Sequence, residues 1–183
     1  VVDTTLPVIT LTGESTVTIE VDSTYTDAGA TATDNYDTGL TSSIVTVSTV
    51  DVTTVGTYTV TYNVTDANGN VAVEVTRTVN VVDTTLPVIT LTGEATVTIE
   101  VGSTYTDAGA TATDLSGEIS VISTGTVDTS VVGTYTVTYN ATDASGNEAA
   151  AVSRTVNVVD TTVPVITLTG EATVTIEVGS TYT

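Results

Sequence analysis

The amino-acid sequence repeats itself almost letter for letter. Residues 1–34 and 81–114 align without a gap and differ at only two positions. A third copy opens at Val158 and matches residues 81–106 at all but one position. The copies start 80 and 77 residues apart (81 − 1 and 158 − 81). A period of this length indicates an array of small domains, each a folding unit that contacts its neighbours.

The 183 residues hold two complete repeats and the start of a third. We predict a first domain at residues 1–82, a second at 83–159, and the first two strands of an incomplete third repeat at 160–183. Units of about 80 residues bury a modest share of their surface and are marginally stable alone. The chain has no Cys, so disulfides are excluded, and the core must come from Val, Ile, Leu, Ala and eight Tyr.

Threonine and apolar residues alternate along most of the chain, as in residues 16–21 and 57–64. Strict alternation of β-branched residues is typical of half-buried strands, and no window has helical spacing. Gly, Asp and Asn turns separate these runs, which favours an antiparallel sandwich. We expect its core to centre on Tyr58, Val60, Tyr62 and Ile19. In the first repeat the predicted strands span residues 8–12, 16–21, 28–33, 44–50, 57–65 and 71–81.

The segments Gly56-x-Tyr58-x-Val60 and Gly133-x-Tyr135-x-Val137 resemble the tyrosine corner of immunoglobulin domains. With Asp-Thr-Thr-x-Pro-Val-Ile and Asp-Ala-x-Gly-Asn, the set resembles bacterial immunoglobulin-like repeats of pesticidal crystal proteins and large surface adhesins, related to hyalin repeats. The resemblance covers the whole chain. It implies an all-β protein of tandem immunoglobulin-like Greek-key β-sandwiches, used as an extracellular spacer or adhesive module at the cell surface, without catalytic residues.

The charge balance is extreme, with two Arg, no Lys, 22 acids and a net charge of −20. Such a chain is a poor partner for nucleic acid and for anionic membrane surfaces, and a good one for divalent cations. No segment reaches the roughly 20 apolar residues of a membrane-spanning helix, so we expect no direct membrane insertion.

Acidic residues recur where a Greek-key topology brings the start of the first strand and two loops to one pole. Carboxylate, amide and carbonyl oxygens at a domain junction suit Ca²⁺, which takes 6–8 oxygen ligands. The alternative is that these residues only cap turns. An EF-hand is excluded because the distal Glu is missing. The predicted Ca²⁺ ligands are Asp3, Asp27, Asp66, Asn68, Asn70, Asp83, Asp107, Asp143, Asn147 and Asp160.

Two further features have structural interpretations. Residues 34–37 hold two acids, but the second repeat has Leu115 and Gly117 in this loop. Residues 34–37 could bind a cation at the other pole, but we interpret them as a plain turn. Arg77 and Arg154 are the only cations, and alternation places them on the inward face. An inward Arg must be paired. We expect a carboxylate such as Asp34 or Asp114, or backbone carbonyls, as partners, with an anion-binding site as the alternative.

The function indicated is structural. Val82 leads into Asp83 and Pro87 without a Gly or Ser spacer, which predicts a stiff junction. We expect a stiff, acidic, calcium-rigidified stalk or fibre of a surface adhesin or filament, with neighbouring repeats and other copies of the chain as partners. A filament subunit completed by strand addition is one alternative, and a carbohydrate- or receptor-binding module is another. Without His, Cys or Lys most nucleophile–base pairs are unavailable, so no enzyme is expected.

Overall fold

The computed structural model describes residues 2–115 and 117–183, so Val1 and Ser116 of the predicted repeats lie outside the described residues. The chain forms two compact units. One comprises residues 1–88 with 112–120 and 141–150, and the other comprises 89–111, 121–140 and 151–183. These units do not test the predicted domain boundaries, which stay a prediction.

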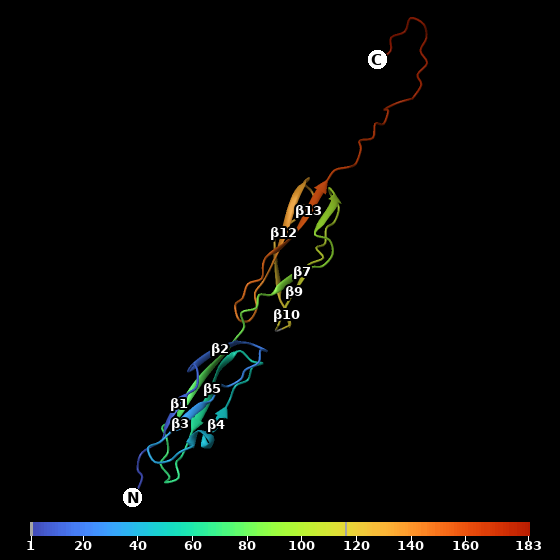
Figure 1. Cartoon of the computed structure of the whole chain (residues 1–183). Helices are drawn as coiled ribbons and strands as arrows, with labels where there is room; N and C mark the ends of the chain where they lie inside the picture. The colour runs from blue at the N-terminus through green and yellow to red at the C-terminus, as the bar shows by residue number, and fades with distance from the viewer. Residues whose placement is uncertain (1, 116) are drawn as a thin grey trace. The chain divides into compact units, whose positions relative to one another are not determined.

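The first repeat is built from strands and one short 3₁₀ helix (Figure 1). The alternating runs found in the sequence form these strands because β-branched residues fit a pleated, half-buried surface. Its elements are β1 (Val8–Leu11), β2 (Thr16–Glu20), β3 (Ala30–Thr33), η1 (Leu40–Ser43), β4 (Val45–Ser48), β5 (Gly56–Asn63) and β6 (Val75–Val82).

The second repeat has the same plan with one change. Its strands are β7 (Val88–Leu91), β8 (Thr96–Glu100), β9 (Ala110–Asp114), β10 (Gly117–Ile119), β11 (Val121–Thr124), β12 (Gly133–Ala141) and β13 (Val152–Val159). The three residues missing from this repeat fall in the connection that leads from β3 into η1 in the first repeat. The shorter connection forms the β9–β10 hairpin instead.

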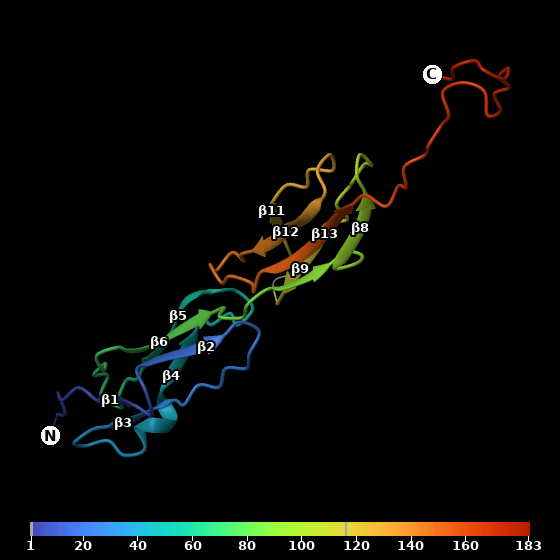
Figure 2. The same ribbon diagram turned by 90° about the horizontal axis from the view of Figure 1, so that it is seen from above.

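Each repeat has a small sheet and a four-stranded sheet. In the first repeat β1 pairs with β3, and the larger sheet has the order β2-β6-β5-β4 (Figure 2). In the second repeat the orders are β10-β9-β7 and β11-β12-β13-β8. The all-β prediction is confirmed.

The predicted antiparallel sandwich holds for most strand pairs, but β2–β6 and β8–β13 are parallel pairs. The first two strands of each repeat therefore do not form a hairpin with one another. Gly13, at φ 82°, separates β1 from β2, so β1 stays with β3 while β2 joins β6 in the other sheet.

The core of the first repeat lies between its two sheets. Val60, Tyr62 and Val79 from the larger sheet are fully buried, and Ile9 and Ala32 from the smaller sheet pack in the same cluster. The predicted core residues Ile19 and Tyr58 are partly buried at its edge. The inward register predicted from alternation is therefore confirmed for β5.

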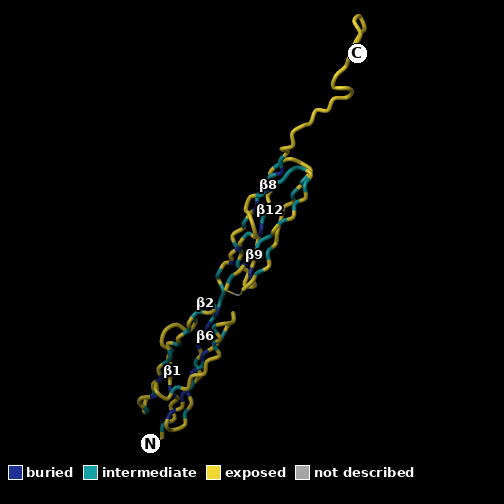
Figure 3. The backbone as a smooth tube through the Cα atoms, turned by 90° about the vertical axis from the view of Figure 1, so that its right-hand side faces the viewer, coloured by how far each residue is buried: buried dark blue, intermediate teal, exposed yellow. Residues whose placement is uncertain are grey.

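Residues 160–183 contain no strand and are exposed throughout, although two strands were predicted there (Figure 3). In the complete repeats the corresponding strands pair with β3 or β9 and with β6 or β13. The partner strands that the structure describes are each already paired within the first or the second repeat. Among the described residues, no helix is long and apolar enough to span a membrane.

Candidate metal centres

The tyrosine corner predicted from the sequence is present in both repeats. The Tyr58 hydroxyl donates to the carbonyl of Thr54 at 2.8 Å, and the Tyr135 hydroxyl donates to that of Val131 at 2.9 Å. A Cβ atom on Gly56 would lie 3.4 Å from the Tyr58 ring, so the backbone at this position runs against the tyrosine. This bond anchors the start of β5 to the preceding loop.

A buried arginine joins the two sheets of the first repeat. The side chain of Arg77 on β6 is 1% exposed, and its Nη1 donates to the Asp27 carboxylate and to the Tyr62 hydroxyl. Its Nε donates to the carbonyl of Glu14 at 2.9 Å, and Nη2 donates to that of Thr12 at 2.5 Å. Because Thr12 follows β1 of the smaller sheet, this side chain links both layers of the sandwich.

Asp27 is the anionic centre of this network. It accepts hydrogen bonds from the Tyr62 hydroxyl at 2.7 Å, from the Tyr25 hydroxyl at 3.0 Å and from the N–H of Gly29 at 3.1 Å. Desolvation raises the pKa of Asp27, but the bonds from Tyr62, Tyr25 and Arg77 together outweigh it and hold the pKa below its ordinary value. Asp107 has the same environment in the second repeat.

This network corrects two predictions. The carboxylate partners of Arg77 and Arg154 are Asp27 and Asp107, not Asp34 or Asp114, although the predicted backbone carbonyl partners are present. Asp27 and Asp107 are therefore held at arginines and do not belong to the carboxylate clusters described next. Alternation showed that the arginines point inward. It could not show which distant acid would face them.

Four aspartates far apart in sequence meet in the first repeat. One carboxylate oxygen each of Asp3, Asp34, Asp37 and Asp66 lies within 4.8 Å of those of the other three. Asp3 precedes β1, Asp34 follows β3, Asp37 lies before η1, and Asp66 follows β5. We name this group the four-aspartate cluster. The interpretation of residues 34–37 as a plain turn at the other pole is wrong, because the strand ends bring this turn beside Asp3 and Asp66.

A tight turn holds Asp66 in place. Its carboxylate accepts hydrogen bonds from the N–H of Asn68 at 2.9 Å, the N–H of Asn70 at 2.7 Å and the Asn70 side-chain amide at 2.7 Å. Desolvation raises the pKa of Asp66, but the bonds from Asn70, Asn68 and Gly69 outweigh it and leave the pKa lowered. Asp66 is therefore an ionised, positioned side chain at 6% exposure.

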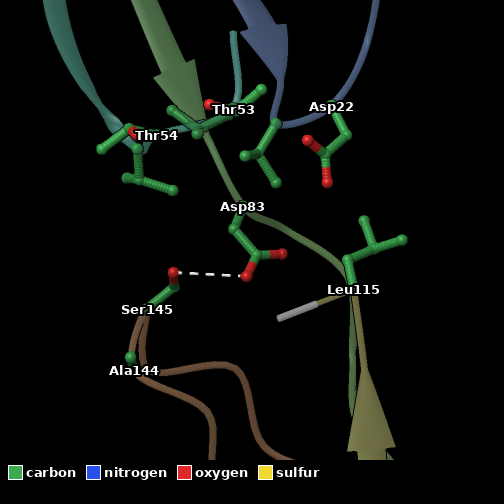
Figure 4. Close-up of a pocket in the computed structure, with 10 residues that line it drawn as sticks. Asp22, Thr53, Thr54, Asp83, Leu115, Ala144 and Ser145 are labelled. Carbon is green, nitrogen blue, oxygen red and sulfur yellow. Dashed lines mark hydrogen bonds between the residues drawn. The ribbon is translucent and has the colours of Figure 1, made fainter. Parts of the chain in front are cut away.

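The second repeat has the same arrangement with three acids. One carboxylate oxygen each of Asp83, Asp114 and Asp143 lies within 4.8 Å of those of the other two. The Asn147 side-chain amide donates to Asp143 at 2.7 Å and to the carbonyl of Asp83 at 3.0 Å. The Ser145 hydroxyl donates to the Asp83 carboxylate at 3.4 Å (Figure 4). We name this group the three-aspartate cluster.

The remaining predicted ligands are placed as follows. Asn70 and Asn147 lie beside the clusters, where each side-chain amide bridges a cluster aspartate and the carbonyl that precedes β1 or β7. The side chain of Asn68 is exposed, and its backbone N–H donates to the Asp66 carboxylate. Asp160 is exposed and accepts the N–H of Thr162.

The cluster members that sequence reasoning missed are Asp34, Asp37 and Asp114. A signal for two of them was present, because Asp34 and Asp114 occupy the same position of the repeat. Asp37 has no counterpart in the second repeat, so comparison of the repeats gives no signal for it.

The clusters suit a hard cation chemically. The chain has only two cationic side chains, and both are paired with Asp27 or Asp107. In the four-aspartate cluster, Oδ2 of Asp3 and Oδ2 of Asp34 are buried and have no hydrogen-bond partner. A buried acceptor without a partner is costly, and a metal ion would satisfy it. Oxygen-only donors favour Ca²⁺ or Mg²⁺ over transition metals.

A glutamate at the end of β2 binds the segment that follows β6. The Glu20 carboxylate accepts the N–H of Thr84 at 2.7 Å, its hydroxyl at 2.9 Å, and the hydroxyl of Thr85 at 3.2 Å. The bond from the Thr84 N–H is the main reason that the pKa of Glu20 is lowered. Glu100 binds Thr161 and Thr162 in the same way after β13.

Comparison with known proteins identifies the family. The family model described as "Bacterial surface protein, Ig-like domain" matches residues 9–81 and again residues 89–158. The chain belongs to the bacterial surface Ig-like domain family. Each match begins within β1 or β7 and ends within β6 or β13, so each Ig-like repeat includes a complete set of strands.

Two curated relatives are sea-urchin hyalins. The chain is 38% identical over 136 residues to hyalin of Strongylocentrotus purpuratus and 37% identical over 195 residues to hyalin of Lytechinus variegatus. The matches cover 69% and 98% of this chain but only 11% and 36% of those proteins. A solved lipoprotein of Bacteroides thetaiotaomicron matches 76% of this chain and 62% of its own at 21% identity and a TM-score of 0.38, too low to add to the assignment. The Ig-like family, described as one of bacterial surface proteins, indicates an extracellular or surface location for a structural or adhesion module.

Proposed function

We propose that this chain is a non-catalytic structural part of an extracellular surface protein, and that Ca²⁺ bound at the aspartate clusters stiffens its Ig-like repeats into a stalk. The observation that carries the proposal is the convergence of Asp83, Asp114 and Asp143, with a matching cluster in the first repeat. Like charges this close repel one another unless a cation lies among them. Ca²⁺ would contribute charge neutralisation and 6–8 coordination bonds to oxygen.

The position of Asp83 supports a mechanical role for this ion. Asp83 belongs to the three-aspartate cluster, and the next two residues are the threonines bound by Glu20. A cation at the cluster would fix Asp83, while Glu20 fixes Thr84 and Thr85. The connection after β6 would then be held at three consecutive residues, which leaves little freedom for hinge motion.

Thermal unfolding of the whole chain with excess Ca²⁺ and with chelator tests the proposal. If only the folded state binds the ion, Ca²⁺ at about 100 times its Kd adds roughly 2.7 kcal/mol per site. Asp83→Asn keeps an oxygen acceptor for the N–H of Thr85 and removes one charge, so it should reduce this gain. Glu94→Gln is the matched control, because it neutralises an exposed side chain of the same repeat. An equal melting temperature with Ca²⁺ and with chelator would contradict the proposal.

Strand addition between chains is the second candidate, favoured by the exposed segment 160–183. This segment leaves Val165 86% exposed and Ile166 93% exposed, and it matches the sequence that forms β7 and β8. Sedimentation velocity over a range of chain concentrations tests this candidate. Growth of head-to-tail oligomers would support it, and a monomer at all concentrations would exclude it. A sugar-binding platform has less support, because Tyr62 and Tyr139 are buried and Tyr58 and Tyr135 are used in corners. The strongly exposed rings are Tyr36 and Tyr182, which lie in separate parts of the sequence.

A further inference from the structure

The two aspartate clusters differ by one carboxylate. Asp3, Asp34 and Asp66 of the first repeat correspond to the three aspartates of the second. Asp37 is the extra member. It comes from the connection after β3, which is three residues longer in the first repeat and continues into η1.

Asp37 is held at the cluster by its own hydrogen bond. Its Oδ2 accepts the N–H of Ala67 at 2.9 Å, and Ala67 is the neighbour of the cluster member Asp66. In the second repeat β10 pairs with β9 directly after Asp114, and Gly117 lies opposite Asp114 in this hairpin. Among the described residues of that repeat, no fourth acid joins the cluster.

The four-aspartate cluster also contains buried carboxylate oxygens that no protein group satisfies. Oδ1 of Asp3 accepts the N–H of Thr5, but its Oδ2 is buried with no partner, and Oδ2 of Asp34 is in the same condition. A cation at this position would be coordinated by two buried carboxylate oxygens that otherwise have no partner.

We infer that the length of the connection after the third strand sets the Ca²⁺ affinity of each repeat, with the first repeat binding more tightly than the second. This inference rests on the proposed Ca²⁺ function. The number of ligand charges is a main determinant of Ca²⁺ affinity in proteins. A site with four carboxylates attracts the ion more strongly than one with three, and the hydrogen bond to Ala67 means that Asp37 needs little reorganisation. An array with both loop lengths fills in two steps as Ca²⁺ rises, so its stiffness is graded rather than all-or-none.

Calorimetric titration of the chelator-treated whole chain with CaCl₂ tests this inference. We expect two sites per chain whose Kd values differ by about tenfold or more. Asp37→Asn keeps an oxygen acceptor for the Ala67 N–H and removes only the charge, so it should weaken the tight site to the level of the other one. Glu14→Gln is the control, since it removes one charge from an exposed side chain of the same repeat and should leave both sites unchanged. Asp114→Asn should weaken only the low-affinity site.

The outcomes separate this inference from the function on which it rests. Absence of Ca²⁺ binding to the folded wild-type chain would overturn both. Two sites of equal affinity, unaffected by Asp37→Asn, would overturn the inference and leave the calcium function standing. Circular dichroism of each variant confirms that the strands persist, so that a lost site is not a lost fold.

Discussion

Replacing Asp27 by Asn should destabilise the first repeat strongly, although the two side chains have nearly the same shape. The change leaves the guanidinium of Arg77, 1% exposed, without a compensating negative charge. Breaking a buried ion pair by removing one partner costs about 3–5 kcal/mol. Because the side chain of Asp27 is 24% exposed and Asn retains one acceptor oxygen, we expect a loss shifted below that range, about 2–4 kcal/mol.

Urea denaturation at pH 7 in the presence of chelator measures this loss. It represents a large part of the roughly 5–15 kcal/mol that stabilises a typical small domain. Asp51→Asn is the control, because Asp51 is exposed and bonds only within its own turn. A loss below about 1 kcal/mol would show that the buried network contributes little, against our reasoning.

The same variant carries a pH signature. The pKa of Asp27 is lowered in the folded state, so its ionised form contributes stability above the ordinary aspartate pKa of about 4, and this contribution is lost as pH falls through the lowered value. The difference between wild type and Asp27→Asn should therefore be constant near neutral pH and shrink in acid. A difference independent of pH would contradict the assignment of the effect to the carboxylate charge.

Three further changes probe other parts of the fold by the same denaturation assay. Tyr58→Phe removes the hydrogen bond to the carbonyl of Thr54 and should cost about 1 kcal/mol, and an unchanged stability would mean the corner bond is not formed in solution. Gly102 has φ 77°, in the left-handed region, so Gly102→Ala should cost about 1–2 kcal/mol of stability. Asp22→Gly at the equivalent position of the first repeat should change the stability little, and equal effects of the two changes would contradict the left-handed conformation. Burial, with the Asp107 carboxylate, raises the pKa of Tyr139 to about 12. Because an unfolded tyrosine ionises near pH 10, part of the stability should be lost between pH 10 and 12. Tyr139→Phe should lack this part, and an unchanged alkaline slope would contradict it.

Short sequence patterns predicted the strand positions, the core residues of β5 and the tyrosine corner, all of which depend on interactions between nearby residues. Alternation of Thr with apolar residues located the strands and placed Val60 and Tyr62 in the core. The Gly56-x-Tyr58 motif predicted the tyrosine corner, because its hydrogen bond spans only four residues. The strand pairing was less accessible. Whether β2 pairs with β1 or with β6 depends on contacts between residues about 60 positions apart, and both choices bury the same alternate side chains.

The candidate site was predictable in part for the same reason. Asp3, Asp66, Asp83 and Asp143 were chosen from topology, and the structure brings them into the clusters. Topology also selects Asp27, but its carboxylate pairs with the buried Arg77. A buried arginine needs a carboxylate partner because of its desolvation, and a sequence pattern does not show which acid lies within reach.

Anomalous diffraction from crystals of the whole chain grown with Ca²⁺ would locate the ion itself. We expect a density peak inside the four-aspartate cluster, about 2.3–2.6 Å from carboxylate oxygens that include Oδ2 of Asp3 or Asp34. A weaker peak is expected among the three aspartates of the second repeat. Absence of any peak at either cluster at millimolar Ca²⁺, with the carboxylates turned apart or bonded to water, would contradict the claim that these repeats are calcium-stiffened.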